Sequence, residues 1–415
     1  MDLEAGAAGT RRPAFQKSLV TSWIWAFAVG VVLLFLIGGR TGTLDSLLIG
    51  GGLAAVGGAI TFYILRSGKL NSARWLLFIG TGLFFGIAFT LEHQVNRGSI
   101  LLSPTIIQDQ EVPICPITIP FVLPPYYIRG EMIFPTSAQA IMGIVLFWFG
   151  LAWLFGRGWC SWLCFFGGID QFFASLAKKP LIKTGPLSQA GRLFPYAFLL
   201  FLILLAVAAL YPLFCAWICP LRIVYDPPTV NSTSEWLTAV IFVTGGMAFL
   251  IVGPYVTKKR LFCSLLCPLL PVNSLLGKLS PFQVKIDPSR CNKCGKCALE
   301  CEMFAVTPES AAGGSPHLEC SRCGRCIDQR PSGAIDFYLI GTRDRIRPVY
   351  VSLAVIFNIL LTAHTSPSWF NTCGPEPFNS SNEENPMAWD TIKRAAAYLY
   401  MIFVILTAFA LLMRS

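Results

Sequence analysis

Cysteine is the residue type whose number and spacing in this chain indicate chemistry, and it occurs 15 times in 415 residues. Seven of them lie in one polar stretch as two triplets spaced C-x2-C-x2-C, with a fourth cysteine four residues after the first triplet. They are Cys291, Cys294, Cys297 and Cys301, then Cys320, Cys323 and Cys326. Three thiolates on a tight loop reach three corners of an iron–sulfur cube. C-x2-C pairs also build structural zinc sites, but the twice-repeated triplet favours iron.

This polar stretch resembles bacterial two-cluster ferredoxins, in which the fourth cysteine of each motif ligates the other cluster. This chain departs from those ferredoxins at two positions. Glu302 stands where a proline usually follows the fourth cysteine, and Arg330 stands where the second motif of those ferredoxins has its fourth cysteine. The resemblance implies one complete [4Fe-4S] cluster, held by Cys301, Cys320, Cys323 and Cys326. The other site has only Cys291, Cys294 and Cys297. It could hold a [3Fe-4S] cluster, hold a [4Fe-4S] cluster with a ligand from elsewhere in the chain or from a partner, or be empty.

A second group of cysteines lies in a sequence repeat within the apolar part of the chain. The segment Arg157-Gly-Trp-Cys160-Ser-Trp-Leu-Cys164 resembles Arg260-Leu-Phe-Cys263-Ser-Leu-Leu-Cys267, 103 residues later. Cys115-Pro and Cys219-Pro form a similar pair, 104 residues apart. The repeat predicts a duplicated membrane unit whose copies have the same orientation, related by a two-fold axis along the membrane normal.

The repeat divides the remaining cysteines into two sets of four. The inner cysteine set, at the cytoplasmic ends of two predicted spans, is Cys160, Cys164, Cys263 and Cys267. The outer cysteine set, on the other side, is Cys115, Cys215, Cys219 and Cys373. Each set suits a cuboidal cluster, because a Cys-x3-Cys pair lies on one helix face. Cysteines that only fill space are the alternative for the inner set, and a disulfide of Cys215 with Cys219 or Cys373 is the alternative for the outer set.

Proline follows two of these cysteines, Cys219 and Cys267, and marks a helix break or a first helical turn. Exposed backbone amides at such a turn would stabilise thiolates.

Composition identifies the class of protein that must carry these cysteines. The chain is 54% hydrophobic and only 13% charged, which is typical of a polytopic membrane protein. Eight apolar segments approach spanning length, at about 18–37, 47–65, 75–91, 136–156, 193–213, 236–256, 348–364 and 395–413. The net charge of +10 comes largely from basic residues beside these segments, where they mark topology, so we expect no nucleic-acid partner.

Lysine and arginine in the short flanks set the orientation of these spans. They favour eight crossings of the cytoplasmic (inner) membrane with both termini inside, and the polar stretch 281–347 then lies in the cytoplasm as well. The expected fold is a mainly α membrane helical bundle with an internal two-fold repeat and an inserted α+β two-cluster ferredoxin-like domain. Its regions are a two-helix part (1–74), the duplicated cysteine-bearing core (75–280), the ferredoxin-like insert (281–347) and a second two-helix part (348–415).

These features together resemble the membrane-integral polyferredoxin proteins of the NapH and NosR kind, over residues 75–345. The shared elements are Cys215-x3-Cys219-Pro, Cys263-x3-Cys267-Pro and the double triplet that follows them. The resemblance implies a membrane-integral iron–sulfur electron-transfer subunit of a respiratory redox complex. It would pass electrons between ferredoxin clusters, membrane clusters and either quinone or an outer-side partner. The chain departs from the family by Phe165 in place of proline and by the extra Cys373.

Two other functions stay open: a quinol dehydrogenase in its own right, and an accessory or maturation reductase for another metalloenzyme. Glu92 and His93 could line an outer quinone pocket, since oxidation of a quinol needs a proton acceptor. A haem between His93 and His364 is a weaker interpretation, and histidines hydrogen-bonded to backbone are the simplest one. No residue is predicted to be catalytic.

Overall fold

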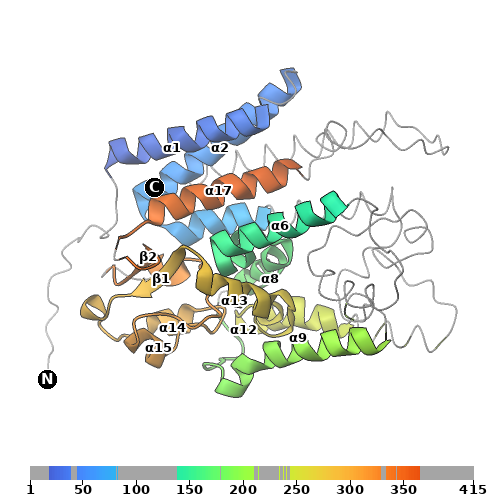
Figure 1. Ribbon diagram of the computed structural model, residues 1–415. Coiled ribbons are helices and arrows are strands. Elements are labelled where there is room, and N and C mark those ends of the chain that lie inside the picture. The colour runs from blue at the N-terminus through green and yellow to red at the C-terminus, as the bar shows by residue number, and fades with distance from the viewer. Residues whose placement is uncertain are drawn as a thin grey trace, which may run out of the picture.

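The structure is a computed structural model. It describes residues 18–38, 44–80, 82, 138–177, 179–209, 214, 233, 237, 240, 244–328, 333–342 and 344–364. In this part of the chain most residues are helical, and the strands form one two-stranded sheet (Figure 1). The mainly helical class predicted from composition is therefore confirmed.

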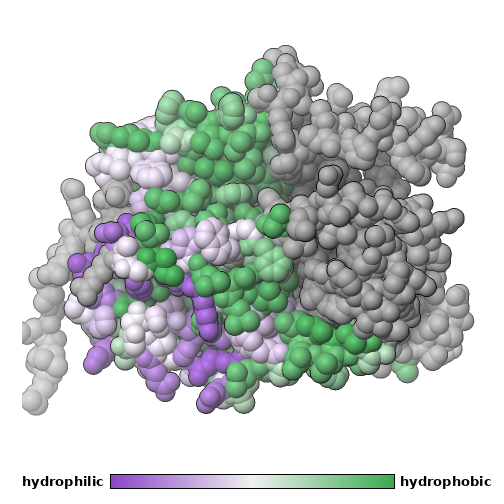
Figure 2. Space-filling view, in the orientation of Figure 1, coloured by the Kyte–Doolittle hydropathy of each residue, from purple (hydrophilic) through white to green (hydrophobic). Residues whose placement is uncertain are grey.

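Five long helices form the apolar part of the described chain. They are α1 (Leu19–Leu33), continued by the π-helix η1 (Leu34–Gly38), α2 (Leu44–Ser67), α6 (Ala138–Phe155), α9 (Gln189–Ala209) and α17 (Arg347–His364). Residues 70–80 are also helical. α17 packs against both α1 and α2. The side chains of α1, η1 and α9 that face outward are largely aliphatic and aromatic, including Phe27, Phe35 and Phe201. Figure 2 shows that apolar side chains cover the long helices, whereas hydrophilic ones gather over the insert.

Within the described residues, two helices are long and apolar enough to cross a membrane, Leu19–Ile37 and Gln189–Ala209. Thr244–Thr257 and Arg347–Leu361 are shorter apolar helices. Two candidate spans thus coincide with predicted ones, while the eight-span layout, its two-fold repeat and its orientation stay predictions. The predicted span at 395–413 lies outside the described residues. Asn358 interrupts the predicted span at 348–364, but its side chain is buried and donates a hydrogen bond to the carbonyl of Trp162.

Short helices surround each Cys-x3-Cys segment of the inner set. In the first copy these are η2 (Gly156–Gly158), α7 (Trp159–Trp162) and α8 (Phe165–Leu176). In the second they are η4 (Ala248–Val252), α12 (Gly253–Thr257), η5 (Phe262–Leu266) and α13 (Leu269–Leu279). A left-handed residue precedes each segment, Gly156 with φ of 52° and Lys258 with φ of 55°. The chain therefore turns sharply before each cysteine pair rather than continuing as one helix.

The insert begins and ends in a shared antiparallel sheet. β1 (Phe282–Ile286) pairs with β2 (Ile335–Leu339), so that Phe282 lies opposite Leu339 and Ile286 opposite Ile335. Between the strands lie η6 (Pro288–Arg290), α14 (Lys296–Glu300), α15 (Pro308–Ala312) and α16 (Arg325–Asp328). Strand pairing brings the two ends of the insert together, and the chain continues directly from β2 into α17.

Buried aromatic rings join the insert to the helical part. The ring of Tyr350, in α17, stacks on Phe337 of β2 at 4.2 Å between centroids. It also contacts Phe282 at 5.3 Å and Trp162 at 6.0 Å. These residues come from the insert, α17 and α7, so a single apolar core continues from the sheet to the inner cysteine set. The insert is held against the helices by the same core that orders the cysteines.

Candidate metal centres

The structure brings the four thiols of the inner cysteine set together. All four are free of disulfides, and Cys160, Cys263 and Cys267 are buried while Cys164 is half-buried. Burial, together with the neighbouring thiol of Cys160, raises the pKa of Cys164 to about 12. Burial and the thiols of Cys160 and Cys164 likewise raise the pKa of Cys267. Each copy of the repeat thus contributes two thiols to one place, and the thiols carry a cost of ionisation that bound metal would offset.

Helix N-termini point their amides at two of these sulfurs. Cys164 precedes α8, and the backbone amides of Phe166 and Gly167 oppose the effect of burial on the pKa of its thiol. Cys267 precedes α13, and the backbone amide of Leu269 likewise opposes the effect of burial on the pKa of the Cys267 thiol. Amide donors at a helix start favour the thiolate form, as expected for Cys267. Phe165 does not disturb the corresponding arrangement at Cys164.

Two buried arginines cross between the copies of the repeat. Nη2 of Arg260 donates to the carbonyl of Cys160 at 2.7 Å. Nη2 of Arg157 donates to the carbonyl of Cys263 at 3.5 Å. Both side chains are fully buried. Arg260 is 103 residues after Arg157, so each arginine binds the cysteine of the other copy in a reciprocal way.

A second reciprocal pair comes from α8 and α13. A carboxylate oxygen of Asp170 accepts a hydrogen bond from the amide of Cys263 at 2.9 Å. Nδ2 of Asn273, again 103 residues later, donates to the sulfur of Cys160 at 3.7 Å. Burial raises the pKa of Asp170 to about 7, although the charge of Arg260 opposes the shift. The sequence analysis did not single out Asp170 or Asn273; the offset of the repeat was the signal that could have found them.

In the insert, Cys301 lies with the second triplet rather than with its own. Burial, followed by the thiol of Cys323, raises the pKa of Cys301. Burial and the thiol of Cys301 raise the pKa of Cys320 to about 12. The pKa of Cys326 is raised by burial and then by Cys323, Cys320 and Cys301. The amide of Ala305 donates to the sulfur of Cys301 at 3.2 Å. This grouping of four thiols is the one that crossed ligation requires.

Of the other three insert cysteines, Cys291 and Cys294 lie on the loop between η6 and α14, and Cys297 lies in the first turn of α14. Cys291 is half-buried, Cys294 is exposed and Cys297 is buried. Gly295 has a φ of 70°, which lets the loop turn sharply at the start of α14. Arg330 lies outside the described residues.

Within the described part of the chain, no three His, Cys, Asp or Glu side chains lie close enough to hold a single metal ion. In a four-iron cube each cysteine binds its own iron, so its sulfurs stand further apart than the sulfurs around one ion. The donor set itself fits iron–sulfur chemistry: four free thiols, amides aimed at them and a buried cation beside them. Buried polar atoms of Asp170, Asn273 and Arg260 also have no hydrogen-bond partner among the described residues.

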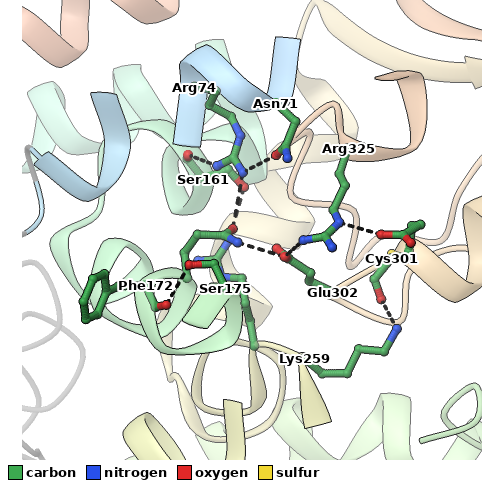
Figure 3. Close-up of polar contacts among 12 residues, drawn as sticks. Asn71, Arg74, Ser161, Phe172, Ser175, Lys259, Cys301, Glu302 and Arg325 are labelled. Atoms are coloured by element: carbon green, nitrogen blue, oxygen red, sulfur yellow. Dashed lines mark hydrogen bonds and ion pairs between the residues drawn. The ribbon is translucent and has the colours of Figure 1, made fainter. Parts of the chain in front are cut away.

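The dipeptide Lys259-Arg260 connects the two groups of cysteines, and Figure 3 shows the contact of Lys259 with Cys301. Nζ of Lys259 donates to the carbonyls of Leu299 and Cys301, each at 2.8 Å. The amide of Arg260 donates to the carbonyl of Glu302 at 3.0 Å, and its side chain donates to the sulfur of Cys263 at 3.4 Å. One dipeptide thus contacts a cysteine of the insert and a cysteine of the inner set.

Glu302, the position that departs from ferredoxin sequences, contributes to the same junction. Its buried carboxylate accepts from Nε2 of Gln171 at 2.8 Å and pairs with Arg325. Gln171 in turn accepts from Arg74, which also donates to the carbonyl of Ser161 at 2.7 Å. Figure 3 shows this chain of contacts running from Asn71 and Arg74 across to Arg325 and Lys259. A proline could not supply this carboxylate, so the departure gives the insert a polar attachment to α8.

Some predicted site residues lie outside the described residues. These are Cys115, Cys215, Cys219, Cys373, Glu92 and His93. His364 is the last residue of α17. The outer cluster, its disulfide alternative, the quinone pocket and the haem all stay predictions.

Comparison with protein families finds a match to a 4Fe-4S binding domain in three parts of the chain. The 4Fe-4S binding domain family matches residues 137–183, 192–228 and 240–286. The first and third segments contain the four cysteines of the inner set, and they are displaced by 103 residues at both ends (240 − 137 and 286 − 183).

Curated relatives agree with this assignment. The NosR protein of Pseudomonas aeruginosa is 26% identical over 180 residues, which cover 42% of this chain and 23% of NosR. The YccM protein of Escherichia coli is 24% identical, covering 49% of this chain and 56% of YccM. The NapH protein of Haemophilus influenzae, named as ferredoxin-type, is 28% identical, covering 45% and 62%. No solved structure matches the chain. The chain therefore contains 4Fe-4S binding domains and is a distant homologue of the polyferredoxin membrane proteins, which confirms the resemblance predicted from its motifs.

Proposed function

We propose that this chain is a ferredoxin-type electron-transfer protein of the membrane, in which the insert and the inner cysteine set hold consecutive redox centres. The observation that carries the proposal is the meeting of four free thiols from two segments 103 residues apart, inside segments that match a 4Fe-4S binding domain. Cysteines kept only for packing do not require amides and a cation aimed at their sulfurs. Bound [4Fe-4S] clusters would supply one-electron oxidation and reduction at both sites.

The residues of the chain have separate tasks in this function. The thiols of the inner set and of Cys301, Cys320, Cys323 and Cys326 would hold the clusters. Trp159 and Trp162, both buried, exclude water from the inner set. Lys259 and Arg260 keep the two centres adjacent, because they contact Cys301 at one end and Cys263 at the other. Adjacent centres favour electron exchange between the insert and the membrane part.

The setting of this electron transfer belongs to the same proposal. Eight spans would place both termini and the insert in the cytoplasm, in a subunit of a respiratory redox complex within the inner membrane. Electrons would continue to quinone or to an outer-side partner. The hydrocarbon layer is about 30 Å thick, so two clusters at its opposite faces need an intermediate carrier or helix breaks that draw them inward. The helix breaks at both inner Cys-x3-Cys segments support the second route.

Iron and acid-labile sulfide counts on the detergent-purified chain, with electron paramagnetic resonance during stepwise reduction, test the inner cluster. We expect more iron than one ferredoxin cluster supplies, and loss of about four irons on replacing Cys160 or Cys263 by Ser. Ser175→Ala, on α8 away from the sulfurs, serves as the matched control and keeps the iron. Iron that stays unchanged in both cysteine variants would overturn the proposal.

A further inference from the structure

The two copies of the repeat surround the inner cysteine set with different charges. In the second copy, the sulfur of Cys263 accepts a hydrogen bond from the Arg260 guanidinium at 3.4 Å. The carboxylate of Asp170 lies beside the same residue, bonded to its amide at 2.9 Å. In the first copy, the sulfur of Cys160 has the neutral amide of Asn273 at 3.7 Å. The buried arginines Arg157 and Arg260 repeat at an offset of 103 residues, but Asp170 corresponds to the neutral Asn273 at the same offset.

The side chains that contact Cys160 and Cys263 are fully buried, which strengthens their electrostatic effect on the inner cysteine set. Arg260, Asp170 and Asn273 have no exposed surface. Interactions between buried charges are screened far less than those at the surface. A guanidinium is not deprotonated in proteins. The guanidinium is thus a permanent positive charge beside Cys263.

We propose that Arg260, Asp170 and Asn273 are positioning residues that set the reduction potential of the inner cluster and make its two halves electrically unequal. The inference rests on the proposed inner cluster and deepens it. Each reduction adds one negative charge to the cluster, which a hydrogen-bonded guanidinium stabilises and a carboxylate destabilises. The Arg260 guanidinium donates to the sulfur of Cys263 but to the carbonyl of Cys160, and the carboxylate of Asp170 contacts Cys263 while the neutral amide of Asn273 contacts Cys160.

Three substitutions of similar shape test the signs. Arg260→Gln should lower the midpoint potential of the inner cluster by a tenfold or larger change in the equilibrium constant, about 59 mV for one electron. Asp170→Asn should raise it. Asn273→Asp, which places a carboxylate beside Cys160 as Asp170 does beside Cys263, should lower the midpoint potential. Arg157→Gln is the matched control, because Arg157 contacts the carbonyl of Cys263 and should shift the potential less than Arg260→Gln does.

The measurement is a redox titration followed by electron paramagnetic resonance, with iron counted in every variant. Opposite shifts for Arg260→Gln and Asp170→Asn, at unchanged iron, are the expected result, and a loosened structure alone would not produce opposite signs. Unshifted potentials, shifts of one sign, or loss of iron in both Asp170→Asn and Asn273→Asp would overturn the inference. A chain without any inner-cluster signal before substitution would instead overturn the proposed function.

Discussion

The inner cysteine set and the loop of Cys291, Cys294 and Cys297 are both thiol groups suited to iron, but they are built differently. The loop is local: its three cysteines lie within seven residues, and Cys294 is exposed. The inner set joins two segments 103 residues apart and has three buried thiols, amide donors and a buried arginine. A local loop can be formed by a few residues, whereas a buried site needs the surrounding fold to hold it.

The largest difference should appear on chelation. We expect an iron chelator under mild oxidation to remove iron from the loop at least about ten times faster than from the inner set, because exposed segments open with little free energy and core segments do not. Resonance signals assigned by Cys294→Ser and Cys263→Ser report each site separately. Equal rates would remove the contrast between a local and an enclosed site. A three-iron signal in the oxidised protein would identify a [3Fe-4S] cluster at the loop site, and its absence with about eight irons in the insert would indicate a recruited fourth ligand.

Arg322 tests whether the fold that encloses the inner set also holds the insert. Its guanidinium donates to the carbonyl of Phe155 at 2.7 Å, to Oγ of Ser280 at 2.6 Å and to the carbonyl of Gly277 at 2.9 Å. Replacement by Met should cost about 3 kcal/mol or more, since several buried acceptors lose their donor. Hydrogen exchange should then increase in β1, α13 and the last turn of α6. Increased hydrogen exchange confined to the segment from Cys320 to Cys326 would contradict this role of Arg322.

Lys259 tests the junction between the insert and the inner cysteine set. Lys259→Met removes two hydrogen bonds to the carbonyls of Leu299 and Cys301 while keeping most of the apolar stem. We expect a loss of about 1–3 kcal/mol in local stability, seen as faster exchange in α14 with unchanged exchange in α8. Lys258→Met, one residue earlier, is the neighbouring control for a lost positive charge.

Removal of the Tyr350 hydroxyl should have the smallest effect on stability. The ring of Tyr350 is buried in the core between the insert and α7, but its hydroxyl has no hydrogen-bond partner among the described residues. Tyr350→Phe should therefore change the free energy of unfolding by less than about 0.5 kcal/mol or stabilise slightly, whereas Tyr350→Ala should cost about 3–5 kcal/mol. Thermal unfolding in detergent distinguishes the two. A large loss from Tyr350→Phe would show that the hydroxyl is bonded.

The sequence predicted that the thiols of the inner set lie together and that Cys301 lies with the second triplet, while the outer set lies outside the described residues. The triplets are recognisable because metal ligands within one loop obey local spacing. The triplets, the Cys-x3-Cys pairs and the offset of 103 residues were all visible in the sequence, and the helix start after Cys267 followed from Pro268. Glu302 illustrates the limit: it was recognisable only as a departure from ferredoxins, and its bonds to Gln171 and Arg325 show why the insert needs it.

What the sequence determined by itself was the chemistry: thiols at iron–sulfur spacing, in a duplicated apolar chain with a polar insert. The tertiary structure decided which groups surround those thiols. Arg157 and Arg260 bind the cysteine of the opposite copy, and Asp170 and Asn273 do the same, because the packing of two distant segments places each of them there. Ligand spacing is set by a few covalent bonds, but contacts between residues about 100 positions apart depend on the burial energy of the whole core.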